Sequence, residues 1–164
     1  TIHDFDMARF LSGDEITQVY ARGTSLVDPE IGRAGDIDTA IVTFDLAGGA
    51  IGFIENSRRA AYGYDQRAEI LGAAGAAATA NDTPSSLVVS DPTGVHKEKP
   101  LHFFLERYEQ SFIAELESFA DAVAEGAEVA VSGEDGLQAM RIAEACRVSL
   151  LEGRPVKLEE IPKE

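Results

Sequence analysis

The sequence has little of several features that define common classes of protein. It holds one cysteine and no tryptophan in 164 residues, and only 14 lysines and arginines against 29 aspartates and glutamates, a formal net charge of −15. A single cysteine excludes a disulfide framework within the chain. The scarcity of basic residues argues against nucleic acids and anionic membrane surfaces as partners. No run approaches the roughly 18 apolar residues that span a bilayer.

The composition that remains is typical of a globular domain. Hydrophobic residues make up 45% and charged residues 26% of the chain. That balance supplies enough apolar surface for a core, and the length suits one domain. One cysteine also fits a reducing compartment, so we expect a cytoplasmic protein.

The chain starts abruptly with a helical pattern. Met7, Phe10 and Leu11 follow the i, i+3, i+4 spacing of a helix, and Gly13 provides a stop. There is no initiating methionine and no polar lead-in before this helix. We therefore expect the chain to be a fragment of a longer protein.

Runs of β-branched and aromatic residues follow the first helix. The pair Gly48-Gly49 between two such runs predicts a hairpin, because glycine supplies the positive φ that tight hairpin turns need. Val42 and Phe44 point to one side of this hairpin and Ile41 to the other, so both sides of the sheet carry apolar residues. We expect helices to cover one side and a partner subunit to cover the other. The predicted strands are residues 16–21, 37–46, 50–58, 67–71, 75–80, 86–90 and a short return at 155–158, with loops at 22–36 and 91–100.

Two long helices are predicted in the second half of the chain. The first runs from about Phe104 to Glu125, and the second begins at Ser132, whose S-x-x-D pattern is an N-terminal capping signature, and reaches about Glu152. Strands grouped together and helices grouped together predict an α+β fold. In that fold an open, mostly antiparallel sheet carries helices packed on one face.

Two common kinds of site are missing from the sequence pattern. No G-x-G-x-x-G follows a strand and no G-x-x-x-x-G-K-[ST] exists, so the chain shows no phosphate-binding loop. His3, His96 and His102 lack the spacing of a metal site, and we predict none. Cys146 falls in an apolar helical stripe and is expected to be a core residue.

Two polar groups are candidates for chemistry. His3 and Asp6 share one face of the first helical turn, where an imidazole could exchange a proton at neutral pH and the carboxylate could orient it or bind a polyol. Alternatively, Asp4 caps the helix and His3 is a surface residue. Tyr62 and Tyr64 flank a glycine after a strand, and either could bind a sugar-like ligand or simply pack its ring.

Several stretches together resemble a known family. TIHDFDMARFL, VDPEIGRAGDIDTA, ENSRRAAYGYDQR, NDTPSS and EKPLHFFLERY are similar to the inositol 2-dehydrogenase branch of the Gfo/Idh/MocA oxidoreductases, from Thr1 to about Leu158. That family joins an N-terminal Rossmann domain, which binds NAD(P), to a C-terminal α+β domain with an open sheet. The resemblance implies that residues 1–164 are a single C-terminal substrate-binding and oligomerisation domain.

The resemblance also assigns roles to residues. His3 matches the family's catalytic acid/base, and Asp6 and Tyr62 match residues that contact the substrate. The family's catalytic lysine and aspartate have no counterpart here, and the E-K-P that contains Lys99 lies in a different domain from the family's E-K-P motif. No cofactor-binding residue is therefore expected in this chain.

The implied function is oxidation of myo-inositol to the 2-keto-inositol by hydride transfer to NAD or NADP, with the cofactor bound mainly by the absent half. The chain alone is expected to be inactive, and to form a homo-oligomer through its open sheet face. The alternatives are a different polyol or sugar as substrate, or a non-catalytic oligomerisation module. An unrelated hydrolase that uses His3 and Asp6 is disfavoured, because no nucleophile or metal set accompanies them.

Overall fold

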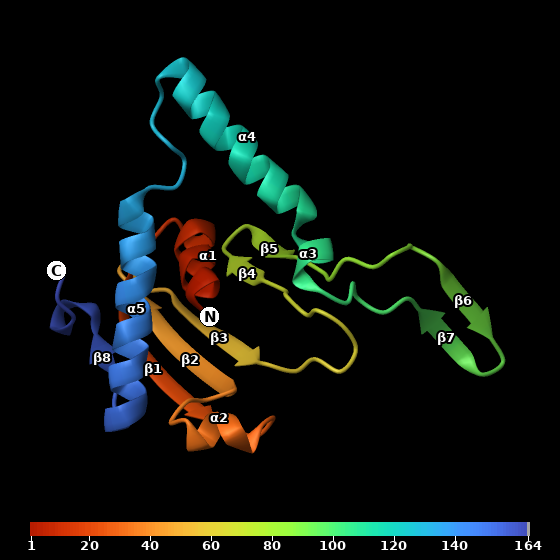
Figure 1. Cartoon of the computed structure of the whole chain (residues 1–164), viewed down its shortest axis with the longest axis horizontal. Coiled ribbons are helices and arrows are strands. Elements are labelled where there is room, and N and C mark those ends of the chain that lie inside the picture. The colour runs from red at the N-terminus through yellow and green to blue at the C-terminus, as the bar shows by residue number, and fades with distance from the viewer. Residues whose placement is uncertain (164) are drawn as a thin grey trace. The chain divides into compact units, whose positions relative to one another are not determined.

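The computed structural model describes residues 1–163 and consists of antiparallel strands and helices (Figure 1). The chain divides into two units, one built from Thr1–Arg59 and the segment that starts at Val131, the other from Ala60–Ala130. No helix within residues 1–163 is long and apolar enough to cross a membrane. In chain order the elements are α1 (Ile2–Ser12), β1 (Ile16–Thr24), α2 (Pro29–Arg33), β2 (Thr39–Leu46), β3 (Ile51–Ser57), β4 (Glu69–Gly72), β5 (Gly75–Ala78), β6 (Val88–Asp91), β7 (Gly94–Lys97), α3 (Phe104–Arg107), α4 (Glu109–Glu125), α5 (Gly133–Glu152), β8 (Val156–Lys157) and the 3₁₀ turn η1 (Leu158–Glu160).

The first unit is built on a four-stranded antiparallel sheet in the order β3-β2-β1-β8. The predicted hairpin between β2 and β3 is confirmed, and Gly49 takes a φ of +89° in its turn. Val19 lies opposite Phe44 on β2 and opposite Val156 on β8, so these side chains point to one face. Helices α1 and α5 cover that face (Figure 1).

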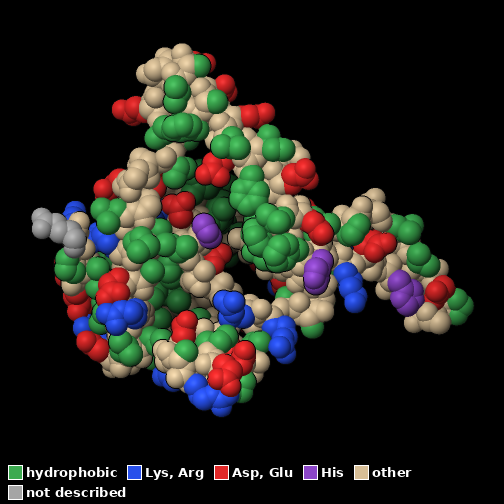
Figure 2. Space-filling model, in the orientation of Figure 1, with side chains coloured by type: hydrophobic (Ala, Val, Ile, Leu, Met, Phe, Trp, Pro, Cys, Tyr) green, Lys and Arg blue, Asp and Glu red, His purple; other side chains and the backbone are tan. Residues whose placement is uncertain are grey.

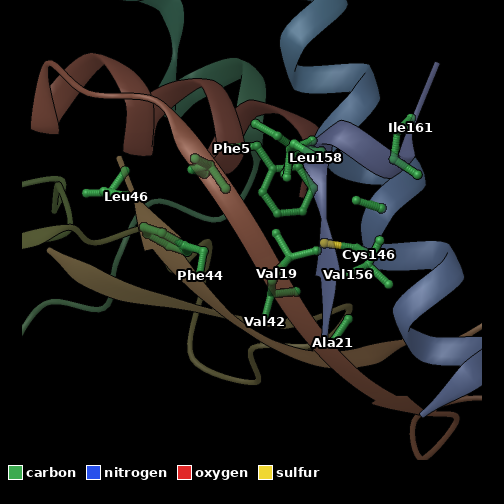
Figure 3. Packing of buried hydrophobic residues seen from close by; sticks show 13 residues of the cluster. Phe5, Val19, Ala21, Val42, Phe44, Leu46, Cys146, Val156, Leu158 and Ile161 are labelled. Atoms are coloured by element: carbon green, nitrogen blue, oxygen red, sulfur yellow. The ribbon is translucent and has the colours of Figure 1, made fainter. Parts of the chain in front are cut away.

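The core of this unit lies between the sheet and the two helices (Figure 3). Phe5 of α1 and Ile142 of α5 are almost fully buried against Val19 and Val156. Cys146 also lies in this cluster, and its burial raises the pKa of its thiol to about 12. A thiol held protonated at neutral pH is not a nucleophile, which agrees with its predicted core role.

The opposite face of the sheet carries large apolar side chains without a helix over them. Ile41, Ile51 and Phe53 are 51%, 81% and 70% exposed, whereas Val42 and Phe44 on the other face are buried. The alternation predicted for the hairpin is therefore confirmed, and so is the placement of helices on a single face. The predicted fold class, an α+β domain with an open antiparallel sheet, is correct.

The predicted loop between β1 and β2 is wrong in part. Strand β1 continues to Thr24, and Asp28 begins the short helix α2 by accepting a hydrogen bond from the backbone N–H of Glu30 at 2.9 Å. Buried Asp38 holds the segment in place, because its carboxylate accepts hydrogen bonds from consecutive backbone N–H groups. The donors are Leu26, Val27 and Asp28, at 2.9, 2.8 and 2.9 Å.

The second unit consists of two hairpins and two helices. The predicted strands near residues 67–71, 75–80 and 86–90 appear as β4, β5 and β6. The loop predicted at 91–100 is wrong, since it contains β7, which pairs with β6. The backbone N–H of Thr93 donates to the Asp91 side chain at 2.7 Å, and Gly94 has a φ of +144°. These turn contacts close the hairpin although β7 carries little apolar pattern.

The helix predicted from Phe104 to Glu125 is also interrupted. It forms α3 and α4, which meet at Tyr108, whose φ and ψ of −108° and 11° are not helical. Gly126 ends α4 in the left-handed conformation, and the predicted end at Glu125 is confirmed. The apolar stripe of α4 is largely exposed, and Figure 2 shows hydrophobic side chains at the surface over α4 and over the β6–β7 hairpin.

Candidate functional site

The first turn of α1 presents His3 at the surface of the first unit. Phe5 anchors this turn in the core, and the Asp4 carboxylate accepts a hydrogen bond of 3.1 Å from the side-chain amide of Asn56 on β3. The N-cap position is Thr1, so the part of the alternative in which Asp4 caps the helix is wrong. Asp4 instead fastens the turn to the sheet, and His3, immediately before these two anchored residues, is exposed, as the same alternative expected.

Asp6 lies one turn from His3 on the same helix and is half-buried. Its carboxylate is 3.4 Å from Nη1 of Arg9, whose side chain is only 10% exposed. Arg9 also binds Glu15 through two hydrogen bonds of 2.9 and 2.7 Å and lies 3.4 Å from Asp135 at the start of α5. The hydrogen bonds from Arg9 hold the pKa of the Glu15 carboxyl below its usual range.

This cluster of charged side chains shapes the surroundings of Asp6. Arg9 connects the C-terminal part of α1 to the loop before β1 and to the first turn of α5. Together with the Asn56–Asp4 hydrogen bond in the first turn, these contacts hold both ends of the helix that carries His3 and Asp6. The sequence analysis missed Arg9. Its helical spacing from Asp6 was the available signal, since residues three apart on a helix can pair.

Tyr62 lies in the second unit, in the segment between β3 and β4, and is 50% exposed. Its hydroxyl donates a hydrogen bond to the carboxylate of Asp65. Neighbouring Tyr64 is partly buried and packs edge-to-face against Tyr108, with ring centroids 5.6 Å apart. Of the two tyrosines considered as ligand contacts, Tyr64 therefore has the packing role and Tyr62 presents a hydroxyl at the surface.

The structure thus brings two of the three predicted site residues together. His3 and Asp6 share α1 in the first unit, and Tyr62 belongs to the second unit. That Tyr62 joins them in one polyol pocket stays a prediction. His96 and His102 are both exposed in the second unit, and His96 Nε2 lies 2.9 Å from the Thr93 hydroxyl. Within residues 1–163, no group of three or more His, Cys, Asp or Glu could hold a metal ion.

Residues 1–163 contain no βαβ unit of the kind that binds a nicotinamide dinucleotide. Every strand pair among residues 1–163 is antiparallel. The βαβ unit, whose first turn and helix N-terminus bind the pyrophosphate of NAD, requires parallel strands.

Comparisons with known proteins place this geometry in a family. Residues 1–158 match the Gfo/Idh/MocA family described as "Oxidoreductase family, C-terminal alpha/beta domain". The chain is 50% identical over 161 residues to the myo-inositol 2-dehydrogenase of Thermotoga maritima, an alignment that covers 98% of this chain and 48% of that protein. The chain therefore spans about half the length of the curated relatives it matches.

Solved structures show the same fold. A probable dehydrogenase from Thermotoga maritima superposes with a TM-score of 0.96 at 49% identity, covering 99% of this chain and 49% of that one. A scyllo-inositol dehydrogenase from Lactobacillus casei, solved with NAD(H) and scyllo-inositol, superposes with a TM-score of 0.87 at 28% identity, covering 96% of this chain and 46% of that one. The match over nearly the whole chain and the shared fold show that this chain belongs to the Gfo/Idh/MocA oxidoreductase family, of which it forms the C-terminal α/β domain.

Proposed function

We propose that this chain is the substrate-binding half of a cytoplasmic, NAD- or NADP-dependent inositol 2-dehydrogenase that oxidises myo-inositol to the 2-keto-inositol. The observation that carries the proposal is the 50% identity with a myo-inositol 2-dehydrogenase over 98% of this chain. The position of His3 is compatible with it, since the imidazole is exposed on a turn that Phe5 and Asp4 fasten to the sheet.

In this proposal His3 handles the proton of the reacting hydroxyl. A carbinol proton is very weakly acidic, and its removal is easiest when a base is in place as the hydride leaves the adjacent carbon. Imidazole suits that role because its ordinary pKa lies near neutrality. The nicotinamide, bound by the other half of such an enzyme, supplies the hydride acceptor.

Asp6 and Tyr62 are proposed to bind the hydroxyls of the polyol. A carboxylate accepts hydrogen bonds from hydroxyl groups, and a tyrosine offers a hydroxyl beside an apolar ring. Arg9 beside Asp6 limits the movement of that carboxylate, which favours a fixed geometry for a bound ring hydroxyl.

The test is a steady-state assay of the full-length protein that contains this chain. NAD reduction with myo-inositol is followed at increasing substrate concentrations, and His3→Ala is expected to lower kcat by about a hundredfold to ten thousandfold. His96→Ala is the matched control, because this histidine is also exposed but lies on a hairpin of the second unit. Full activity of His3→Ala would overturn the role proposed for His3.

A second candidate keeps the family and changes the substrate. The Lactobacillus casei relative was solved with scyllo-inositol, a stereoisomer whose ring hydroxyls are arranged differently. Comparing kcat/KM for myo-inositol, scyllo-inositol and glucose distinguishes the two, since the preferred substrate has the highest value. A preference for scyllo-inositol or glucose would replace myo-inositol in the proposal.

A non-catalytic assembly module is the remaining alternative. The apolar side chains on the open face of the sheet favour an assembly role, but that role is compatible with catalysis and does not replace it. We propose that the chain forms a homo-oligomer through this face in addition to binding the substrate.

A further inference from the structure

A network of hydrogen bonds in the second unit converges on Asp65. Its carboxylate accepts from Nε of Arg67 at 2.8 Å, from Nη2 of Arg67 at 3.1 Å and from the side-chain amide of Asn81 at 2.5 Å, and it also accepts from the hydroxyl of Tyr62. The side chain of Asp65 is only 16% exposed. The hydrogen bonds from Arg67, then those from Tyr62 and Asn81, hold the pKa of the Asp65 carboxyl well below its usual range. Asp65 is therefore a fixed, ionised acceptor.

The backbone fixes this network in turn. The side-chain oxygen of Asn81 accepts a hydrogen bond of 2.8 Å from the backbone N–H of Gln66, the residue after Asp65. Asn81 thus contacts both the side chain of Asp65 and the backbone beside it, although it lies 16 residues further along the chain. The orientation of the carboxylate is consequently set by a long-range contact.

A carboxylate can only accept hydrogen bonds, so the hydrogen of the Tyr62 hydroxyl must point toward Asp65. A phenol oxygen can also accept hydrogen bonds, and with its hydrogen committed to Asp65 the hydroxyl can act toward a ligand only as an acceptor. Tyr62 is half-exposed while Asp65 is largely covered, so a ligand can meet the tyrosine and not the carboxylate.

We propose that Asp65 is a positioning residue that orients Tyr62 and makes its hydroxyl an acceptor for a hydroxyl group of the polyol. This inference rests on the proposed function, and in particular on Tyr62 as a substrate contact. It implies that Tyr62 selects for a ring hydroxyl that donates a hydrogen bond at its position.

The experiment measures KM and kcat for myo-inositol in the full-length protein with Tyr62→Phe, Asp65→Asn and the double variant. Each single change is expected to raise KM by about tenfold, the usual cost of a lost hydrogen bond to a ligand, with kcat changed by less than about twofold. The double variant should resemble Tyr62→Phe alone, because Asp65 acts through Tyr62 and the two changes remove the same interaction.

Two further variants test whether a change in KM comes from the network around Asp65. Asn81→Ala removes one donor and leaves the carboxylate, so a smaller rise in KM is expected. Glu69→Gln makes the same charge change on an exposed residue of β4 and should leave both parameters unchanged. Thermal unfolding of each variant shows whether the protein remains folded at the assay temperature.

The outcomes separate the inference from the proposed function. A raised KM for Tyr62→Phe with an unchanged KM for Asp65→Asn, or additive effects in the double variant, would overturn the positioning role alone. An unchanged KM for Tyr62→Phe would overturn the substrate contact and the inference with it, while the His3 assay still decides the reaction. If the unmodified protein does not oxidise myo-inositol, the proposed function and the inference both fail.

Discussion

At the scale of single residues, three buried polar side chains tie distant segments of the first unit together. Ser149 accepts a hydrogen bond of 3.0 Å from the backbone N–H of Ala21 and donates one of 2.6 Å to the carbonyl of Arg154. Arg141 donates to the carbonyls of Leu158 and Ile161 at 2.8 and 3.0 Å. Asp38 performs the same task for the segment before α2. Each satisfies backbone groups that burial would otherwise leave unpaired.

Asp38 gives the molecule a defined response to acid. Burial alone would raise the pKa of its carboxyl, but hydrogen bonds from the backbone of Asp28, Leu26 and Val27 and from the Thr39 hydroxyl together lower it well below the usual range. A depressed native pKa stabilises the folded state above the unfolded pKa of about 4, and this stabilisation is lost as the pH falls toward the native pKa.

We therefore predict that Asp38→Asn lowers the urea midpoint of the chain at pH 7. The difference from the unmodified chain should shrink below about pH 4, where the unmodified chain loses the contribution of Asp38. Urea titrations at several pH values measure both effects. Asp36→Asn is the control, because Asp36 is exposed and accepts a hydrogen bond from the adjacent Ile37 N–H. Equal midpoints for the two variants at pH 7 would contradict the role given to Asp38.

At the scale of elements, strand pairing places an aromatic ring over a glycine. Phe44 on β2 lies opposite Gly52 on β3, and its ring covers the space where a side chain at position 52 would stand. A Cβ atom built on Gly52 would lie 2.2 Å from the Cζ atom of Phe44. Because Phe44 is buried in the core, the ring has little room to move aside.

Gly52→Ala is accordingly expected to destabilise the first unit by about 1–3 kcal/mol, the usual cost of overpacking. Urea unfolding followed by circular dichroism measures the change. Gly72→Ala is the matched control, since its Cβ atom would meet only the Gly75 carbonyl oxygen at 3.6 Å. A midpoint for Gly52→Ala equal to that of the control would show that Phe44 can repack without cost.

At this scale, backbone geometry also overrides simple patterns in the sequence. In β1 a register shift between Ile16 and Gln18 sets two residues opposite one, so Ile16 joins the buried face that Val19 occupies. Simple alternation would have placed it on the other face. Two predictions failed because the apolar pattern does not record backbone geometry. The non-helical backbone of Tyr108 interrupts the predicted helix, and turn contacts close the hairpin that contains β7.

At the scale of the whole molecule, the open face of the sheet is the feature that bears on assembly. Ile41, Ile51 and Phe53 form a patch of large exposed side chains, and such patches on soluble proteins commonly mark interaction surfaces. The strand register places these residues on the face away from α1 and α5. A second copy of the chain is the partner we propose for this face.

We predict that the chain sediments as a dimer or larger oligomer at micromolar concentration, and that Phe53→Asp shifts it toward monomer. A carboxylate buried in an apolar interface would lose its hydration without gaining a partner, so association should weaken. Leu151→Asp is the control, because Leu151 is exposed on α5, away from the open face. A monomeric unmodified chain would count against the proposed interface.

The sequence by itself determined the features that depend on near neighbours. Helix α1 with its stop at Gly13, the β2–β3 hairpin and its alternation, and the start of α5 were predictable, because each follows from residues a few positions apart. At the start of α5 the Asp135 carboxylate accepts from the Ser132 N–H at 2.8 Å and from its hydroxyl at 2.9 Å. His3, Asp6 and Tyr62 were candidates from their positions on a helix face and after a strand, and motif resemblance assigned their roles.

Only the tertiary structure decided which groups hold those candidates in place. Asn56 reaches Asp4 from 52 positions away, and Arg9 meets Asp135 across 126 positions. Asn81 likewise reaches Asp65 from the far side of a hairpin. Hydrogen bonds and ion pairs act only over a few ångströms, and it is the packing of the folded chain that brings such distant residues within that range.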